Sequence, residues 1–439
     1  MPVASRRTWR AQLAGLTVFL LSAATALAQP AVEIGCMYPM TGRGALYGRD
    51  SVAAIEMAVE AINARGGAAG HQLRVHLADS QSRPAFAVSI ARRFIDETKV
   101  HFLCGVVSSS VGLAVSKVAL ERRKIFIGTD HGSSRLTIES AHPYYFRVSN
   151  NSYQSMAAGA LWLNDLRRER PWRTIAFIGP DYEYGRGMWA DLRAKLDEIG
   201  VAYEVAGTLW PKLYEPDFTA YIEELKRLKP DIIVNGHWGG DFVAFVKQAR
   251  ALGLFENRVF ANFDAGANYE ILAALGEDMP LGLVLSARHH VNWPATARNR
   301  AFVENFRTRT GRYPSYAAEG AYAGILAIAK AVESVGSPSD TGKLIAALEG
   351  MELELPEDPD GFRSRIDPDT HQIIQMQAIG IVRRDPSFPP AAALLGDFKV
   401  YRAEDLMPSQ QELRRRRENF GNRIAETPSF PESVKEDMK

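Results

Sequence analysis

The chain has 439 residues, of which 46% are hydrophobic, and its 52 Lys and Arg nearly balance its 51 Asp and Glu. This length exceeds one ordinary domain, and the apolar content can fill two hydrophobic cores. The balanced charge offers no basic surface for nucleic acid or for an anionic membrane, so we exclude both classes of partner.

The first segment of the chain is typical of a secretory signal peptide. Arg6, Arg7 and Arg10 precede an apolar stretch that closes with the small residues Ala26 and Ala28, the order of features that precedes signal-peptide cleavage. A membrane anchor is the alternative, but the stretch is shorter than the roughly 20 apolar residues that a span needs. We expect cleavage after Ala28 and export to the periplasm, by either the general or the twin-arginine route. The mature chain then carries 49 Lys and Arg against 51 Asp and Glu, a net charge of −2.

The two cysteines, Cys36 and Cys104, each lie in a short apolar run that is typical of a buried strand. They form a disulfide if the compartment is oxidising and their Cα atoms lie within about 7 Å, and otherwise they are two buried thiols. The sequence leaves both alternatives open.

From Val32 onward, short apolar runs alternate with amphipathic segments of helical length. Runs such as VEIGCMYP, LRVHLADS and HFLCGVV are each followed by a helical pattern, and the alternation restarts with TIAFIGPDYEYG and DIIVNGHWGG. Strand and helix in repeated succession predict right-handed crossovers and a parallel sheet with helices on both faces. Two such runs predict two similar, doubly wound α/β lobes. The polar end of the chain, which contains RRRRENFGNR, is predicted to be a partly helical or loose tail.

Ligand sites in open parallel sheets lie at the carboxyl ends of the strands. Here those ends carry MTGRGALYG, SSS, TDHGSS, PDYEYG, GHWGGD and FDAGAN. The three serines follow a strand and open a helix, where hydroxyl groups and free backbone N–H groups suit a carboxylate or another anion. Helix capping is the alternative role for these serines.

The motifs of common enzymes are absent from the sequence. There is no G-x-S-x-G elbow and no P-loop, and the adjacent His289 and His290 lack the further ligands of a metal site. We therefore expect a protein that is not an enzyme and that uses no cofactor and no metal. A hydrolase with Ser109 as its nucleophile is the catalytic alternative.

An ordered set of motifs runs along the chain: MYPMTGRGALYGRD, AINARGG, GVVSSSVGLAV, PDYEYGRG, DFTAYIEELKRLKPDIIV and FVKQARALGL. With these motifs the chain resembles the type I periplasmic solute-binding proteins of ABC importers, specifically the branched-chain amino acid binding family. The resemblance covers residues 32 to about 385. It implies two lobes joined by a hinge of three crossovers, with the ligand enclosed in the cleft between them. The implied division is a signal peptide at 1–28, a first lobe of 29–150 plus 283–360, a second lobe of 151–282 plus 361–405, and a polar tail at 406–439.

The resemblance also implies which residues bind the carboxylate of a ligand. In the first lobe these are Ser109, with Ser108 beside it, and the stretch formed by Asp130, His131 and Gly132. Amino-acid binders carry small neutral residues at this second position, and an acidic side chain there repels an anion unless it turns away or pairs with Arg135. A different amino acid, a small amide or an aromatic acid is therefore the alternative to leucine.

The other implied contacts come from aromatic and acidic side chains. Tyr47 covers the ligand from the first lobe, Tyr184 and Trp238 contact it from the second, and Asp264 receives an α-ammonium group. Ordinary core packing is the alternative for Tyr184 and Trp238, and helix capping is the alternative for Asp264.

The resemblance thus implies a monomeric periplasmic component of an ABC importer. It captures a small polar solute, an amino acid or a related compound, and delivers it to a permease in the inner membrane. The alternative is a sensory or regulatory protein of the same fold that binds a small amide or an aromatic acid.

The secreted protein is expected to begin at Gln29, because Ala26 and Ala28 fit the small-residue pattern at signal-peptide cleavage sites. Intact mass spectrometry of periplasmic material measures this directly. A mass that retains residues 1–28 would contradict the export prediction.

Overall fold

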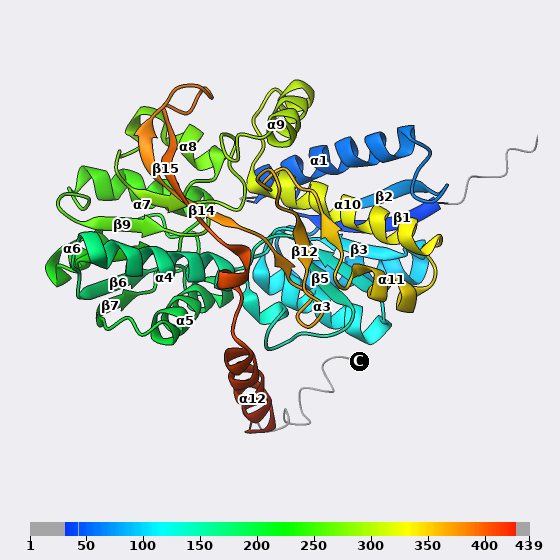
Figure 1. Ribbon diagram of the computed structural model, residues 1–439, viewed down its shortest axis with the longest axis horizontal. Helices are drawn as coiled ribbons and strands as arrows, with labels where there is room; N and C mark the ends of the chain where they lie inside the picture. The colour runs from blue at the N-terminus through cyan, green and yellow to red at the C-terminus, as the bar shows by residue number, and fades with distance from the viewer. Residues whose placement is uncertain (1–30, 43, 427–439) are drawn as a thin grey trace, which may run out of the picture.

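The structure is a computed structural model that describes residues 31–42 and 44–426, and these residues form two α/β lobes side by side (Figure 1). Each lobe is built on its own sheet, with helices packed on both faces. This confirms the predicted fold class. The predicted signal peptide lies outside the described residues.

The first lobe contains five parallel strands in the order β2-β1-β3-β4-β5. Strands such as FLCG are buried on both faces, as parallel strands between two helical layers must be. The strands are β1 (Ala31–Tyr38), β2 (Gln72–Asp79), β3 (Phe102–Gly105), β4 (Ile125–Gly128) and β5 (Tyr145–Arg147). One face is covered by α1 (Ala45–Ala64), α10 (Tyr316–Val335) and α11 (Thr341–Leu348), and the other by α2 (Pro84–Arg93) and α3 (Ser109–Arg122).

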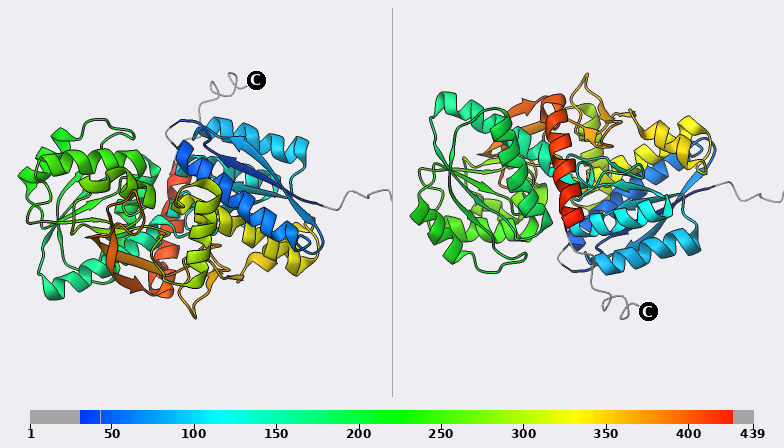
Figure 2. Two further views of the ribbon diagram at one scale, coloured as in Figure 1. Left: turned by 90° about the horizontal axis from the view of Figure 1, so that it is seen from above. Right: turned by 90° about the horizontal axis from the view of Figure 1, so that it is seen from below.

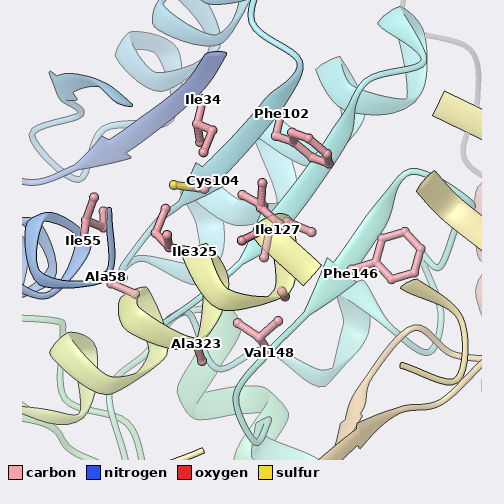
Figure 3. Packing of buried hydrophobic residues seen from close by; sticks show 14 of the residues in the cluster. Ile34, Ile55, Ala58, Phe102, Cys104, Ile127, Phe146, Val148, Ala323 and Ile325 are labelled. Carbon is pink, nitrogen blue, oxygen red and sulfur yellow. The ribbon is translucent and has the colours of Figure 1, made fainter. Parts of the chain in front are cut away.

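Helices α1 and α10 pack closely over the first sheet because their facing positions are apolar and often small. Ile55 and Ala58 of α1 and Ala323 and Ile325 of α10 converge on strand residues such as Ile127 (Figure 3). The spacing of Ile55 and Ala58 puts them on one helical face. This contact fixes α10, and therefore the residues at its N-terminus, against the first lobe.

The second lobe contains seven strands in the order β15-β14-β10-β9-β8-β6-β7. Strand β14 runs antiparallel to both of its neighbours, β10 and β15. The strands are β6 (Thr174–Ile178), β7 (Glu204–Leu209), β8 (Ile232–Asn235), β9 (Val259–Asn262), β10 (Val284–Ser286), β14 (Gln377–Arg384) and β15 (Ala393–Tyr401). The helices are α4 (Ser152–Glu169), α5 (Glu183–Glu198), α6 (Thr219–Leu228), α7 (Gly239–Ala251) and α8 (Tyr269–Leu275). Helix α9 (Ala297–Thr310) packs against both the second-lobe core and α1.

The chain passes between the lobes three times, but two of the passages lie later than the predicted boundaries. Strand β10 pairs with β9 of the second sheet, so the chain leaves this lobe after residue 286 and not at 283. A small antiparallel sheet of β11 (Glu352–Leu353), β12 (Ser364–Ile366) and β13 (Ile373–Ile374) follows. Ile366 and Ile373 belong to the first-lobe core, so the chain returns only after residue 374 and not at 361.

The tail at 406–439 was predicted to be partly helical or loose, and its described part is mostly helical, but it is packed rather than free. Residues 410–426 form helix α12 (Gln410–Glu426), which packs against the lobes, and its Leu413 and Arg416 are buried. The residues after 426 lie outside the described part. No helix of the described residues combines the length and hydropathy that crossing a bilayer requires.

Cys36 and Cys104 form a disulfide inside the first lobe. They are register partners on the neighbouring parallel strands β1 and β3, and their Cα atoms lie 4.5 Å apart. Of the two alternatives left open above, the structure has the disulfide. It cross-links residues that are 68 positions apart in sequence.

Reduction of this disulfide is expected to lower the free energy of unfolding by about 2–4 kcal/mol, because a cross-link across a long loop restricts the unfolded chain. Urea unfolding with and without a reductant measures the effect. The double variant Cys36→Ala/Cys104→Ala is the control, and it should not respond to the reductant. An unchanged midpoint in fully reduced wild-type protein would contradict this prediction.

Candidate ligand-binding site

A narrow pocket lies between the two lobes, where strand ends of both sheets meet. Its volume is about 20 Å³, room for about one water molecule and far below the roughly 300–1,000 Å³ of small-molecule sites. The two lobes are therefore closed on each other here, and a ligand enters only when they separate. It is lined by Val107, Ser109, Asp130, Gly132, Tyr182, Tyr184, Trp238, Ala265, Arg288 and Tyr316.

Four helices begin at this pocket. Ser109 and Tyr316 are the first residues of α3 and α10, and Tyr182 and Trp238 immediately precede α5 and α7. None of these four N-termini has a side-chain cap hydrogen bond. Backbone N–H groups and the positive ends of four helix dipoles therefore gather around the pocket, and together they favour an anion.

Arg288 provides the cation of the pocket, and its side chain is only 5% exposed. Its Nε donates to Oδ1 of Asp264 at 3.0 Å, its Nη2 donates to Oδ2 at 2.7 Å, and its Nη1 donates to the backbone carbonyl of Asp130. The guanidinium also lies 5.1 Å from the ring centre of Tyr316. An arginine has five N–H donors, so two of them stay available to a ligand in the pocket.

Asp264 is buried behind Arg288 and does not line the pocket. Besides Arg288, Ser155 Oγ donates to its Oδ1 at 2.6 Å and Tyr184 Oη donates to its Oδ2. Burial alone raises the pKa of Asp264, but the neighbouring Arg288 outweighs burial and holds the pKa below its ordinary value. The guanidinium thus occupies the position at which the sequence predicted an ammonium group, and that role of Asp264 stays a prediction.

Asp130 lines the pocket, in surroundings that favour its uncharged form. Its Oδ2 accepts from Ser51 Oγ at 3.4 Å, while its Oδ1 has no hydrogen-bond partner among the described residues. Burial raises the pKa of Asp130 well above its ordinary value. A neutral carboxyl group can donate a hydrogen bond to a carboxylate.

His131 lies outside the pocket lining, although the sequence placed it among the ligand contacts. Its Nδ1 lies 3.0 Å from the backbone carbonyl of Val106, and its Nε2 lies 2.7 Å from Tyr145 Oη. Because a carbonyl only accepts, Nδ1 carries the proton and Nε2 accepts from the tyrosine. Burial and the nearby Arg147 hold the pKa of His131 well below its ordinary value. His131 is a neutral core residue that fixes the loop carrying Asp130.

Of the two predicted serines, Ser109 and Ser108, only the first lines the pocket. Ser109 lines the pocket, and its Oγ accepts from the backbone N–H of Ser133 at 3.1 Å, so its own hydroxyl hydrogen is free for a ligand. Ser108 precedes α3 and lies outside the lining. Gly132 lines the pocket where a Cβ would lie 2.5 Å from both Arg288 Nη2 and Tyr184 Cε2. Only glycine leaves room for that contact between the lobes.

Aromatic rings form most of the remaining wall. Tyr184 and Trp238 line the pocket, and Trp238 Nε1 donates to Tyr182 Oη at 3.0 Å. Tyr47 lies in a second layer, with its ring centre 5.9 Å from that of Trp238 and 5.5 Å from that of Tyr316. Tyr47 therefore supports the wall and does not line the pocket.

Sequence reasoning missed five lining residues, namely Val107, Tyr182, Ala265, Arg288 and Tyr316. Arg288 follows β10 by two positions, and Tyr182 lies in the PDYEYG motif, so the strand-end rule could have found both. Tyr316 carries no comparable signal, because it begins a helix that is distant in sequence from the strands it joins.

His289 and His290 are buried, and burial lowers their pKa values to about 4 and about 3. His289 Nε2 lies 2.9 Å from Asn299 Oδ1. Within residues 31–42 and 44–426, no group of three or more His, Cys, Asp or Glu residues could hold a metal ion.

Replacing Asp264 by Asn is expected to lower the free energy of unfolding by about 3–5 kcal/mol, because it leaves the buried Arg288 without its counter-charge. Urea unfolding at pH 7 measures the change. Asp181→Asn is a matched control, because Asp181 pairs with Arg186 at 2.8 Å on the surface, with side chains 48% and 51% exposed. No measurable change is expected in the control, and equal effects of the two variants would refute the importance of the buried pair.

The comparisons with known proteins agree with this architecture. A family model described as periplasmic binding protein matches residues 31–385. A leucine-, isoleucine-, valine-, threonine- and alanine-binding protein of Pseudomonas aeruginosa is 24% identical over 345 residues, which are 79% of this chain and 89% of the relative. A Leu/Ile/Val-binding protein homolog of Brucella melitensis is 26% identical over 83% of this chain and 86% of its own length.

Two solved structures have the same fold. A solute-binding protein of an ABC transporter from Rhodopseudomonas palustris, in complex with 3,4-dihydroxybenzoic acid, has a TM-score of 0.74 and 25% identity, over 85% of this chain and 98% of that one. A periplasmic binding protein from Burkholderia mallei has a TM-score of 0.76 and 23% identity, over 87% of this chain and 97% of that one. With two lobes, a pocket between them and a family match over most of its length, this chain belongs to the periplasmic binding protein family, as a type I member of the branched-chain amino acid binding group.

Proposed function

We propose that this protein is the solute-binding component of an ABC importer and that it captures a small carboxylic acid between its lobes. The observation that carries the proposal is the pocket itself, in which a buried arginine with two spare N–H groups faces four uncapped helix N-termini. Such a site binds an anion through charge and hydrogen bonds together. It works in the periplasm and passes its ligand to a permease in the inner membrane.

The charges around the pocket support an anionic ligand. Arg288 and Asp264 neutralise each other, and burial raises the pKa of Asp130 well above its ordinary value, which favours its uncharged form. A further guanidinium, Arg147, is fully buried, and its Nε and Nη1 have no hydrogen-bond partner among the described residues. Arginine keeps its proton in proteins, so Arg147 adds a buried positive charge that a carboxylate would compensate.

The walls favour an aromatic acid over an amino acid. Tyr182, Tyr184, Trp238 and Tyr316 supply flat apolar surfaces, and such surfaces pack well against a ring. Both oxygens of Asp264 already accept from donors of the protein, which leaves no free carboxylate for an ammonium group. The similar R. palustris protein was solved with 3,4-dihydroxybenzoic acid. An amino acid is the second candidate, since the P. aeruginosa relative is named for five of them.

Capture without turnover is the expected activity, and the protein is expected to work as a monomer. Ser109 accepts a hydrogen bond from a backbone N–H, and no histidine lines the pocket to act as its base. The similar R. palustris structure is named as a solute-binding protein of an ABC transporter, so a sensory role is not favoured over import.

A thermal melt screen tests the ligand class. Benzoate, 4-hydroxybenzoate, 3,4-dihydroxybenzoate, leucine and the uncharged benzamide are the ligands to compare. A ligand at 1,000 times its dissociation constant adds about 4 kcal/mol of apparent stability, so a bound acid should raise the melting temperature clearly. Stabilisation by benzamide but not by benzoate would contradict an anion site, and stabilisation by leucine alone would favour the amino-acid candidate.

Ser109→Ala and Ser108→Ala form a matched pair for the best acid of that screen. Ser109→Ala is expected to weaken binding by about three- to tenfold, because one hydroxyl donor is lost while the backbone N–H groups stay. Ser108→Ala is expected to change binding less than twofold, since Ser108 lies outside the pocket lining. Calorimetric titration measures both, and a larger effect of Ser108→Ala would overturn the assignment.

A further inference from the structure

Helix α12 lies along the junction of the two lobes and contacts both of them (Figure 2). On the first lobe, Arg417 Nε donates to the carbonyl of Ile138 at 3.0 Å, and the guanidinium of Arg135 lies 4.7 Å from the ring centre of Phe420. On the second lobe, Leu413 packs into the core. The helix begins beyond residue 385, where the family match ends.

Arg416 is the buried cation of α12, with 8% of its surface exposed. Its Nη1 lies 2.7 Å from Oδ1 of Asp191 and 3.7 Å from Oε1 of Glu139, and its Nε lies 2.6 Å from Oε1 of Glu412. Asp191 of α5 is fully buried. Within the described residues, Arg416 is the cation found at ion-pair distance from Asp191.

Asp191 in turn holds the loop that lines the ligand pocket. Ser134 Oγ donates to the two oxygens of Asp191 at 3.1 and 3.0 Å, and Ser152 Oγ donates to Oδ2 at 2.6 Å. The backbone N–H of Ser134 donates to Ser152 Oγ at 3.2 Å, and that of Ser152 donates to the carbonyl of Gly132 at 2.7 Å. Gly132 lines the pocket. A continuous chain of polar contacts therefore joins α12 to the ligand site.

We propose that Arg416 is a positioning residue for the ligand pocket. By neutralising the buried Asp191, it keeps that carboxylate dry and fixed, so that both serines stay bound to it and the Gly132–Ser134 loop stays in place. Without the arginine, a buried carboxylate lacks its counter-charge and has to gain water, and this loosens the two serine hydrogen bonds. The consequence for ligand binding rests on the proposed function, whereas the positioning of the loop does not.

Hydrogen exchange on the full-length, ligand-free protein tests the positioning. In Arg416→Gln, the amides of Ser133, Ser134 and Ser152 are expected to exchange about tenfold faster, as loss of roughly one hydrogen bond's stability implies. Arg415→Gln is the matched control, because Arg415 is 56% exposed and pairs with Glu412 on the same helix. Faster exchange confined to α12, with the loop amides unchanged, would overturn the proposal.

Arg416→Lys covers the case in which Arg416→Gln does not fold. Lysine keeps the charge, so the loop amides are expected to keep their exchange rates within about twofold. The guanidinium of Arg416 lies 5.1 Å from the ring centre of Tyr153. Faster exchange of the loop amides in Arg416→Lys would assign their slow exchange to this packing and would reject the charge argument.

The ligand readout separates this proposal from the proposed function. Binding of 3,4-dihydroxybenzoate is expected to weaken about fivefold or more in Arg416→Gln and to stay unchanged in Arg415→Gln. If the wild-type protein does not bind this acid, the proposed ligand class fails, while the exchange rates still decide whether Arg416 positions the loop.

Discussion

The pairing of Arg288 with Asp264 is the interaction on which the rest of the ligand site depends. Neither charge could stay buried alone, because an unpaired ion in the interior costs several kcal/mol. Arg288 lies just beyond β10, where the chain leaves the second lobe, and its guanidinium also reaches the carbonyl of Asp130 in the first lobe. The pair therefore sets both the charge of the pocket and the relative position of the strand ends that form it.

The three charged positions next to the ligand show how the environment decides the role of a residue. Arg288 lowers the pKa of Asp264, whereas burial raises the pKa of Asp130, although both residues follow parallel strands in the same way. A raised pKa weakens the repulsion expected for an acidic residue beside a carboxylate. The pocket presents the guanidinium of Arg288 and several helix N-termini as hydrogen-bond donors.

Much of the fold could be predicted from the sequence, because most strands of the parallel core are followed by a helix. The lobe boundaries could not, since β10 and β12 have three residues each and β13 has two, too little chain for a periodic pattern. Ser109, Asp130, Gly132, Tyr184 and Trp238 line the pocket because strand ends meet there.

The prediction for His131 was wrong in its position, and the partners of two acidic residues were not found. His131 points into the core. The spacing of residues along the sequence does not reveal which side chains of a loop are buried, because that depends on packing in three dimensions. Asp264 pairs with an arginine 24 positions away, and Asp191 of α5 pairs with Arg416 of α12. Such pairings between separate segments follow from the three-dimensional arrangement, so a single sequence does not contain them.

The four helix N-termini at the pocket are divided between the lobes, with α3 and α10 on the first and α5 and α7 on the second. All four helix ends attract a bound anion only while the lobes are together, because the attraction of a helix end falls off within about one turn. Separating the lobes therefore weakens the hold on the anion by geometry alone, without a competing ligand or a change of pH. A membrane partner that does mechanical work on the lobes can unload this protein even if its own affinity for the solute is low.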